Sequence, residues 1–243
     1  MILVQGAPVY YEIVGEGDPV ILVHGLSGST LWWVRNIQTL AQHHKVYLLD
    51  LPSFGTMNRA HPRFALSTAG SWLIEWMEAI GLQQADFIGH SMGGFICLWI
   101  AAHQPYRVSR LVLVSPAIFP QSHSLMSYFV PLLKAIRELT PLFFPILLYD
   151  ALRAGPFTLL SAASELVRED LQDKIKAVET PTLLIWGEND TLVPASMGQT
   201  LRQTMKHARL HIINRAGHVS MFDRPQAFNT VVEAYLAGQS VGE

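Results

Sequence analysis

The stretch Gly89-His90-Ser91-Met92-Gly93 decides the fold, because it places a G-x-S-x-G motif between a strand and a helix. The apolar run before it, 85–88, predicts a short buried strand, and the run after it, 94–102, predicts a helix. A serine on such a turn is held in a strained conformation with its hydroxyl pointing away from the sheet. Glycine is needed at 89 and 93, since a Cβ there would collide with neighbouring backbone. The motif therefore predicts that Ser91 is a nucleophile.

A serine nucleophile needs a base, an acid that orients the base and hydrogen-bond donors for the developing oxyanion. Downstream of Ser91, a predicted strand at 181–186 leads into Gly187-Glu188-Asn189-Asp190. A second predicted strand at 210–213 is followed by Gly217-His218, and upstream a buried strand at 20–23 leads into His24-Gly25-Leu26. Serine, acid and histidine thus occur in that chain order, each directly after a strand.

With these motifs, the chain resembles the α/β-hydrolase superfamily, in particular its single-domain esterase, perhydrolase and C–C hydrolase group. The shared signals run from His24-Gly25 through Asp50–Gly55 and the Ser91 motif to Gly217-His218, and so cover most of the chain. Two positions depart from the family pattern. Ser53 stands where many relatives have glycine, and Asp223 stands where glutamate is commoner. We expect both departures to leave the catalytic residues untouched.

The resemblance implies a Ser-His-Asp triad, in which Ser91 is the nucleophile, His218 the general base and then acid, and Asp190 the residue that orients the histidine. It also implies that the backbone N–H groups of Leu26 and Met92 form the oxyanion hole. No cofactor and no metal ion are expected, because no pair of histidines has the spacing of a zinc site with a Cys, Asp or Glu partner.

Each assignment has an alternative. Glu188 ends the same predicted strand as Asp190 and could supply the acid instead. In some family members the acid follows the preceding strand, but Ser115-Pro116 at that position offers no carboxylate. His218 could be a loop histidine with a structural hydrogen bond, and we expect that kind of structural role for His24. His43 and His44 are expected at the solvated end of a polar helix.

The rest of the chain alternates between predicted strands and helices, which indicates an α/β fold: a mostly parallel twisted sheet with helices on both faces. Residues 9–14 and 20–23 are expected to open the sheet as an antiparallel pair. The predicted parallel strands lie near 46–49, 87–88, 111–114, 183–186 and 210–213, with a helix at 71–80. All three triad candidates then fall at the carboxyl ends of strands, where open α/β sheets bind ligands.

One segment breaks the alternation. The stretch from 117 to 180 is far longer than the roughly 10–15 residues of a simple crossover helix. Its apolar patches at 125–139 and 142–152, interrupted by prolines and by Gly155-Pro156, predict a small helical lid before the penultimate strand. A helix near 166–178 should lead back into the sheet. The expected division is a core domain of residues 1–116 and 178–243 and a lid insertion with its connecting helix at 117–177.

Composition favours a compact enzyme of 243 residues with 50% hydrophobic and 15% charged residues. A net charge of −2 gives no reason to expect nucleic acid as a partner. The uncharged run 139–149 is too short to cross a membrane, for which about 20 residues are needed, although contact of the lid with a lipid surface remains an alternative. A single cysteine, Cys97, and an N-terminus without a signal-peptide pattern favour a cytoplasmic location. The oligomeric state is not indicated.

These observations predict a hydrolase that cleaves small-molecule carboxylic esters with an apolar acyl or alcohol part. Three alternatives use the same fold: hydrolysis of a C–C bond in diketone-like ring-cleavage products, cofactor-free perhydrolysis, and a ligand receptor with slow turnover. The loop Gly25-Leu26-Ser27-Gly28-Ser29 differs from the Gly-Pro-Gly type that many C–C hydrolases carry, which counts against that alternative. The complete triad counts against an inactive scaffold.

Overall fold

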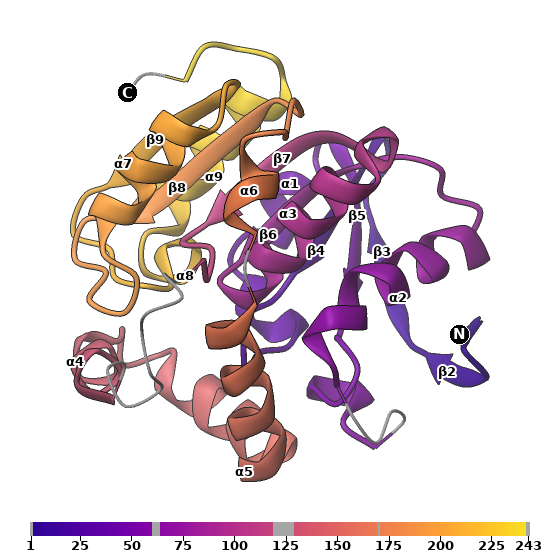
Figure 1. Ribbon diagram of the computed structural model, residues 1–243, viewed down its shortest axis with the longest axis horizontal. Coiled ribbons are helices and arrows are strands. Elements are labelled where there is room, and N and C mark those ends of the chain that lie inside the picture. Colours follow the sequence, from indigo (N-terminus) through magenta and orange to yellow (C-terminus); the bar gives the residue numbers. More distant parts are fainter. Residues whose placement is uncertain (1, 60–63, 119–128, 170, 242–243) are drawn as a thin grey trace.

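The computed structural model describes residues 2–59, 64–118, 129–169 and 171–241. Its centre is a seven-stranded sheet with the strand order β3-β5-β4-β6-β7-β8-β9 (Figure 1). Strand β3 pairs antiparallel with β5, and the other neighbours pair in parallel. This mostly parallel sheet confirms the predicted fold class. The strands are β3 (Tyr11–Val14), β4 (Asp18–Val23), β5 (His44–Leu49), β6 (Ala85–His90), β7 (Val108–Val114), β8 (Thr182–Gly187) and β9 (Ala208–Ile213), and a separate hairpin of β1 (Ile2–Val4) and β2 (Ala7–Val9) precedes them.

The predicted antiparallel pair at the start of the sheet is wrong. Strand β5 lies between β3 and β4, so that Tyr11 pairs with Leu49 and Val20 pairs with Val46. The turn between β3 and β4 lies against the beginning of β5 instead of closing a hairpin. A Cβ on Gly15, whose φ is +82°, would come within 2.4 Å of the backbone oxygens of Ala41 and His44. Because Gly15 lacks a side chain, the turn can cross close to the beginning of β5, from β3 on one side to β4 on the other.

Alternate residues of the central strands enter two separate cores, one on each face of the sheet. In β4, Ile21 and Val23 belong to one core, and Val20 and Leu22 belong to the other. This period of two, with apolar residues at every position, is typical of a parallel strand buried on both faces. The first core is covered by α2 (Leu66–Ala79), α3 (Met92–His103), α6 (Gln172–Ile175) and α7 (Ala195–Thr204), and the second by η1 (Thr30–Trp33), α1 (Ile37–Leu40), α8 (Ser220–Asp223) and α9 (Pro225–Leu236).

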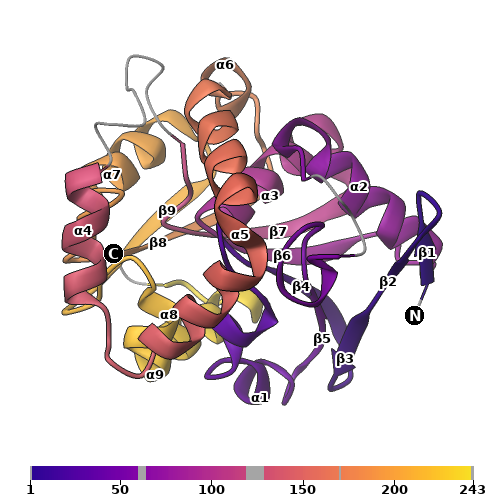
Figure 2. The ribbon, with the colours of Figure 1, turned by 90° about the horizontal axis from the view of Figure 1, so that it is seen from below.

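Along the chain, the helices α4 (Phe129–Glu138) and α5 (Phe144–Arg168) come between β7 and β8. We call residues 129–168 the α4–α5 segment. Helix α5 crosses the end of the sheet where β4 and β6 finish (Figures 1 and 2). It contacts both cores, through Ile146 and Leu147 on one face and through Ala162 and Leu166 on the other. The segment therefore bridges the two layers at the carboxyl ends of the strands.

The helices of this segment differ in part from the prediction. Helix α4 falls within the predicted 125–139, of which 125–128 lie outside the described residues, and α5 begins near the predicted 142 but continues to Arg168. Gly155 interrupts α5 with φ 76° and ψ 157°, because the residue before Pro156 avoids helical backbone. The prediction of a single connecting helix near 166–178 is wrong, because α5 ends at Arg168 and a separate short helix, α6 (Gln172–Ile175), follows it. The division into a core and a lid domain stays a prediction.

Within the described ranges, no helix is both long enough and apolar enough to span a membrane.

Candidate active site

Ser91 lies on the turn between β6 and α3. Its backbone has φ 51° and ψ −115°, a left-handed conformation that costs free energy for a residue with a side chain. Three backbone hydrogen bonds hold it there: its N–H donates to the carbonyl of Val114 at 2.9 Å, and its carbonyl accepts from Phe95 at 3.1 Å and Ala117 at 3.0 Å. The strained strand-to-helix turn that the motif predicts is therefore present.

The two glycines of the motif are needed for close packing. A Cβ on Gly89 would lie 2.6 Å from the carbonyl oxygen of Gly93, and a Cβ on Gly93 would lie 2.3 Å from the carbonyl oxygen of Val23 in β4. Real Cβ atoms essentially never approach backbone so closely. The turn can bring Ser91 this near to β4 only because both positions lack a side chain.

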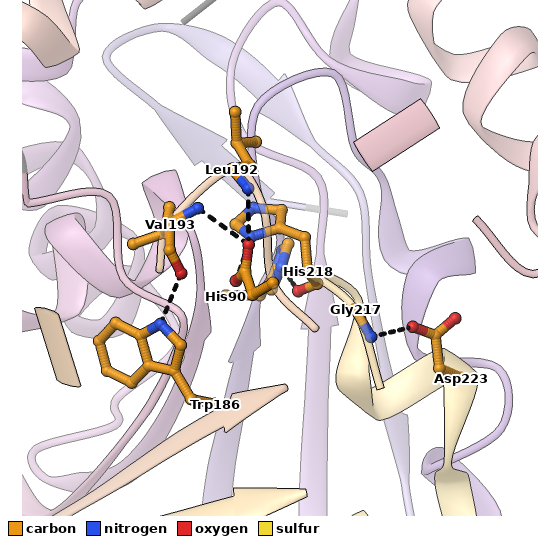
Figure 3. Close-up of polar contacts among 8 residues, drawn as sticks. His90, Trp186, Leu192, Val193, Gly217, His218 and Asp223 are labelled. Atoms are coloured by element: carbon orange, nitrogen blue, oxygen red, sulfur yellow. Dashed lines mark hydrogen bonds and ion pairs between the residues drawn. The ribbon is translucent and has the colours of Figure 1, made fainter. Parts of the chain in front are cut away.

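Asp190 and His218 meet across the ends of β8 and β9. The Nδ1 atom of His218 donates to Oδ2 of Asp190 at 2.9 Å. The other carboxylate oxygen accepts from the backbone N–H groups of Leu192 at 3.0 Å and Val193 at 2.8 Å, which lie beside the histidine in Figure 3. Such a pair fixes the imidazole tautomer and leaves Nε2 free to accept a proton.

The charge of Asp190 is stabilised despite its burial. Desolvation opposes ionisation, but the nearby His218 and the hydrogen bonds from His218 and Val193 outweigh it and hold the pKa of the Asp190 carboxyl below its usual range. Glu188, the alternative acid, is exposed and accepts instead from the backbone N–H of Arg215 at 2.9 Å. The structure therefore brings Asp190, and not Glu188, to the histidine.

His24 has the structural contacts that we expected. Its Nδ1 donates to the carbonyl oxygen of Gly25 at 2.9 Å, and its Nε2 accepts from the backbone N–H of Leu51 at 3.0 Å. Burial lowers the pKa of the ring, so the imidazole is neutral and ties the end of β4 to the end of β5. With both ring nitrogens engaged, His24 orders the loop that starts at Gly25.

His90 is a residue whose importance the sequence analysis missed. Its Nε2 donates to the backbone carbonyl of His218 at 2.9 Å, and the two imidazole rings lie 4.8 Å apart between centroids (Figure 3). Burial, together with the nearby His218, lowers the pKa of His90 to about 3. The only sequence signal is its place directly before Ser91. A neutral His90 thus connects the turn of the nucleophile to the loop of the base.

The loop after β4 passes close to Ser91. A Cβ on Gly25 would lie 3.1 Å from the Cβ of Ser91, and the loop is closed by a hydrogen bond from the Gly28 N–H to the Gly25 carbonyl at 3.0 Å. Leu26 lies within this loop, and Met92 is the first residue of α3, where N–H groups have no partner inside the helix. This arrangement is compatible with an oxyanion hole at the start of a helix dipole. The donor roles of the Leu26 and Met92 N–H groups stay a prediction, as does the hydrogen bond from the Ser91 hydroxyl to His218.

Asp223, one of the two departures from the family pattern, binds the loop that carries His218. Its carboxylate accepts from the Gly217 N–H at 2.9 Å and from the Thr140 hydroxyl at 2.6 Å. The first contact, drawn in Figure 3, fixes the backbone next to His218. The second ties that loop to the turn between α4 and α5. Among the described residues, no cluster of three or more His, Cys, Asp or Glu side chains is placed to hold a metal ion.

The comparisons with known proteins agree with this fold. The chain matches the Alpha/beta hydrolase family over residues 20–231 and belongs to that family. It is 26% identical to a 2-hydroxy-6-oxo-2,4-heptadienoate hydrolase of Pseudomonas putida, over 98% of this chain and 96% of that one. It is also 26% identical to a pimeloyl-[acyl-carrier protein] methyl ester esterase of Vibrio cholerae, over 90% and 94% of the two chains.

A solved structure shows the same fold at similar sequence identity. The crystal structure of a hydrolase from Pseudomonas aeruginosa superimposes with a TM-score of 0.82, at 26% identity and over 97% of both chains. These relatives are hydrolases, which supports hydrolase activity for this chain.

Proposed function

We propose that this protein is a serine hydrolase that cleaves carboxylic esters with an apolar acyl or alcohol part through an acyl-enzyme on Ser91. The observation that carries the proposal is the 2.9 Å hydrogen bond between His218 and a buried Asp190, at the same edge of the sheet as the strained turn of Ser91. The V. cholerae relative named as a methyl ester esterase supports an ester as the substrate.

In the proposed reaction, the Ser91 hydroxyl attacks the ester carbonyl while Nε2 of His218 removes its proton. The N–H groups of Leu26 and Met92 hold the negative oxygen of the tetrahedral intermediate. His218 then gives the proton to the departing alcohol. A water molecule, activated by the same imidazole, attacks the acyl-enzyme, and collapse of the second intermediate releases the acid and restores the Ser91 hydroxyl. Asp190 stays ionised and stabilises the imidazolium at each step.

The proposed apolar preference comes from the α4–α5 segment, which would act as the lid. A narrow crevice beside His218 is lined by Ala135, Glu138 and Leu139 of this segment, together with Asn189, Thr191, Gly217 and Asp223, so the segment reaches the base. The apolar character of the proposed lid comes from α5, which crosses the ends of β4 and β6 and carries Ile146, Leu147 and Leu159. We expect these side chains of α5 to favour hydrocarbon over charged groups.

The proposal is tested with p-nitrophenyl esters of graded acyl length. Each methylene buried under the lid contributes up to about 0.8 kcal/mol, or roughly fourfold in kcat/KM, so activity should rise from acetate towards hexanoate. A fluorophosphonate probe should label Ser91, and Ser91→Ala should lose about 10⁴-fold in kcat. Labelling of a different serine, or near-normal turnover by Ser91→Ala, contradicts the triad. A single burst without further turnover points to a receptor.

A second candidate function is C–C bond hydrolysis, which the P. putida relative supports because its name denotes a hydrolase of a dienoate and because it aligns with nearly the whole chain. The same nucleophile and base would act on a vinylogous diketone, whose absorbance disappears on cleavage. Steady-state kcat/KM on such a compound and on p-nitrophenyl butyrate, measured with the same preparation, separates the two functions. A higher value for the diketone overturns the ester assignment.

A further inference from the structure

Asp150 is buried although it lies on the α4–α5 segment, where many side chains are exposed. Its exposed fraction is 1%, whereas the adjacent Tyr149 is 51% exposed. Oδ2 of Asp150 accepts from the hydroxyl of Ser29 at 2.8 Å and from the indole N–H of Trp32 at 3.0 Å. The Asp150 carboxylate of α5 is therefore bound, inside the core, by two donors from the part of the chain that follows β4.

The first donor belongs to the predicted oxyanion loop. Ser29 ends the run Gly25–Ser29 and also begins η1, where its hydroxyl oxygen accepts from the Leu31 N–H at 3.3 Å. The same hydroxyl gives its only proton to Asp150, which fixes its rotamer. Ser29 directly follows the tight turn that carries Leu26, in which the Gly28 N–H donates to the Gly25 carbonyl at 3.0 Å.

The second donor leads to the base. The Trp32 ring lies 5.5 Å from the ring of His90 and 5.0 Å from that of Phe143, measured between centroids. His90 in turn donates to the backbone carbonyl of His218. By accepting from the indole N–H, Asp150 fixes the Trp32 ring between His90 and Phe143, the residue that precedes α5.

Burial of the Asp150 carboxylate costs free energy, and this cost would be absent if α5 were attached to the core by an apolar side chain. The other carboxylate oxygen of Asp150, Oδ1, is buried and has no hydrogen-bond partner among the described residues. Burial raises the pKa of Asp150 to about 6, against the effect of the hydrogen bonds from Ser29 and Trp32. An apolar side chain would attach α5 without burying an unpaired oxygen. Such costs are concentrated at functional sites, where the geometry they fix is used.

We propose that Asp150 is a positioning residue through which the α4–α5 segment orders the oxyanion loop, by fixing Ser29 and Trp32. This inference rests on the proposed function, because it assigns Asp150 a part in stabilising the oxyanion at Leu26. Asp150 touches neither substrate nor reacting atoms in this role. It acts on the transition state through the backbone of the loop, so it should affect kcat more than KM.

The test compares Asp150→Ala and Asp150→Asn with a control on the same helix. Asp150→Ala should lower kcat for p-nitrophenyl butyrate by about ten- to hundredfold, the cost of a misplaced catalytic group, with little change in KM. Asp150→Asn keeps an acceptor oxygen for both donors and should restore most of the activity. Glu165 also joins α5 to the core, but its Oε2 accepts from the N–H of Leu66 at 2.6 Å, which belongs to α2 and not to the oxyanion loop. Glu165→Ala should therefore leave kcat within about threefold.

A rise in KM at unchanged kcat in Asp150→Ala overturns the inference, and so does an equal loss of kcat in Glu165→Ala. If Asp150→Ala does not fold, judged by circular dichroism, Ser29→Ala removes the same hydrogen bond from the core side. Unchanged kcat in Ser29→Ala then refutes the role of the contact.

The rate of Ser91 labelling by a fluorophosphonate separates this inference from the proposed function. If wild-type protein is not labelled at Ser91, the serine-hydrolase proposal fails. If wild-type protein and Asp150→Ala are labelled equally fast, the hydrolase proposal stands and the role of Asp150 fails.

Discussion

The buried His90 predicts a specific loss of stability in acid. Its pKa is about 3 in the folded protein and near 6.5 in the unfolded chain, so between these values the unfolded state binds a proton that the folded state does not. The free energy of unfolding must then fall as the pH falls. The 1.5 units between pH 6.5 and pH 5, at about 1.4 kcal/mol each, give a contribution of about 2 kcal/mol. This figure is the same for any folded pKa well below 5.

The variant His90→Gln isolates this contribution. Glutamine does not titrate, and its amide can still donate to the His218 carbonyl that His90 binds at 2.9 Å. Other titrating groups, including Asp190 and His24, are present in both proteins, so their contributions cancel. The free energy of unfolding of the wild type should therefore fall by about 2 kcal/mol relative to that of the variant from pH 7 to pH 5. Urea denaturation followed by tryptophan fluorescence measures it.

A stability difference that is constant over this pH range would refute the reasoning. So would an NMR titration in which the His90 ring of the folded protein takes up its proton near pH 6.5.

Further substitutions test other contacts. Asp190→Asn should lower kcat by about 10⁴-fold, because it favours the wrong imidazole tautomer, while Glu188→Gln should do far less; the reverse ranking would contradict the acid assignment. Gly93→Ala should lower the free energy of unfolding by about 3 kcal/mol or more, because its Cβ would lie 2.3 Å from a carbonyl oxygen of β4. In Gly217→Ala the new Cβ would lie 3.4 Å from its nearest neighbouring atom, so the loss of stability should be small. Equal unfolding midpoints for the two variants would refute this. Burial raises the pKa of the Cys97 thiol, so iodoacetamide should modify it only after unfolding, and rapid alkylation of folded protein would argue against the described packing.

The parts of the fold that the sequence predicted depend on local patterns. The apolar run before Ser91, the motif itself and the helix after it are contiguous, and the structure confirms them as β6, the strained turn and α3. The place of β5 between β3 and β4 could not be read in this way, because strand pairing joins residues that are far apart in the chain. His44 shows the same limit: it was expected to be solvated at a helix end, but it is buried as the first residue of β5.

The candidate site divides along the same line. Chain order and strand ends led to His218 and to the turn that holds both Glu188 and Asp190, and the resemblance to the family favoured Asp190. The structure brings Asp190 and His218 together. The contacts of Asp150 with Ser29 and Trp32 connect residues more than a hundred positions apart. An aspartate within a run of apolar residues carries no signal that it will be buried against a loop after β4. Such contacts follow from tertiary packing, which neither periodicity nor spacing encodes.

The contact of Asp150 with the core also bears on the engineering of chimeric enzymes. Exchange of the α4–α5 segment between hydrolases is an obvious route to a new substrate range, since the triad candidates lie outside it. In this chain, a transplant without an acceptor at position 150 would leave the Ser29 hydroxyl and the Trp32 N–H buried and unpaired, at about 1–3 kcal/mol each. A successful graft must therefore bring its own acceptor, or be accompanied by apolar replacements at both core positions.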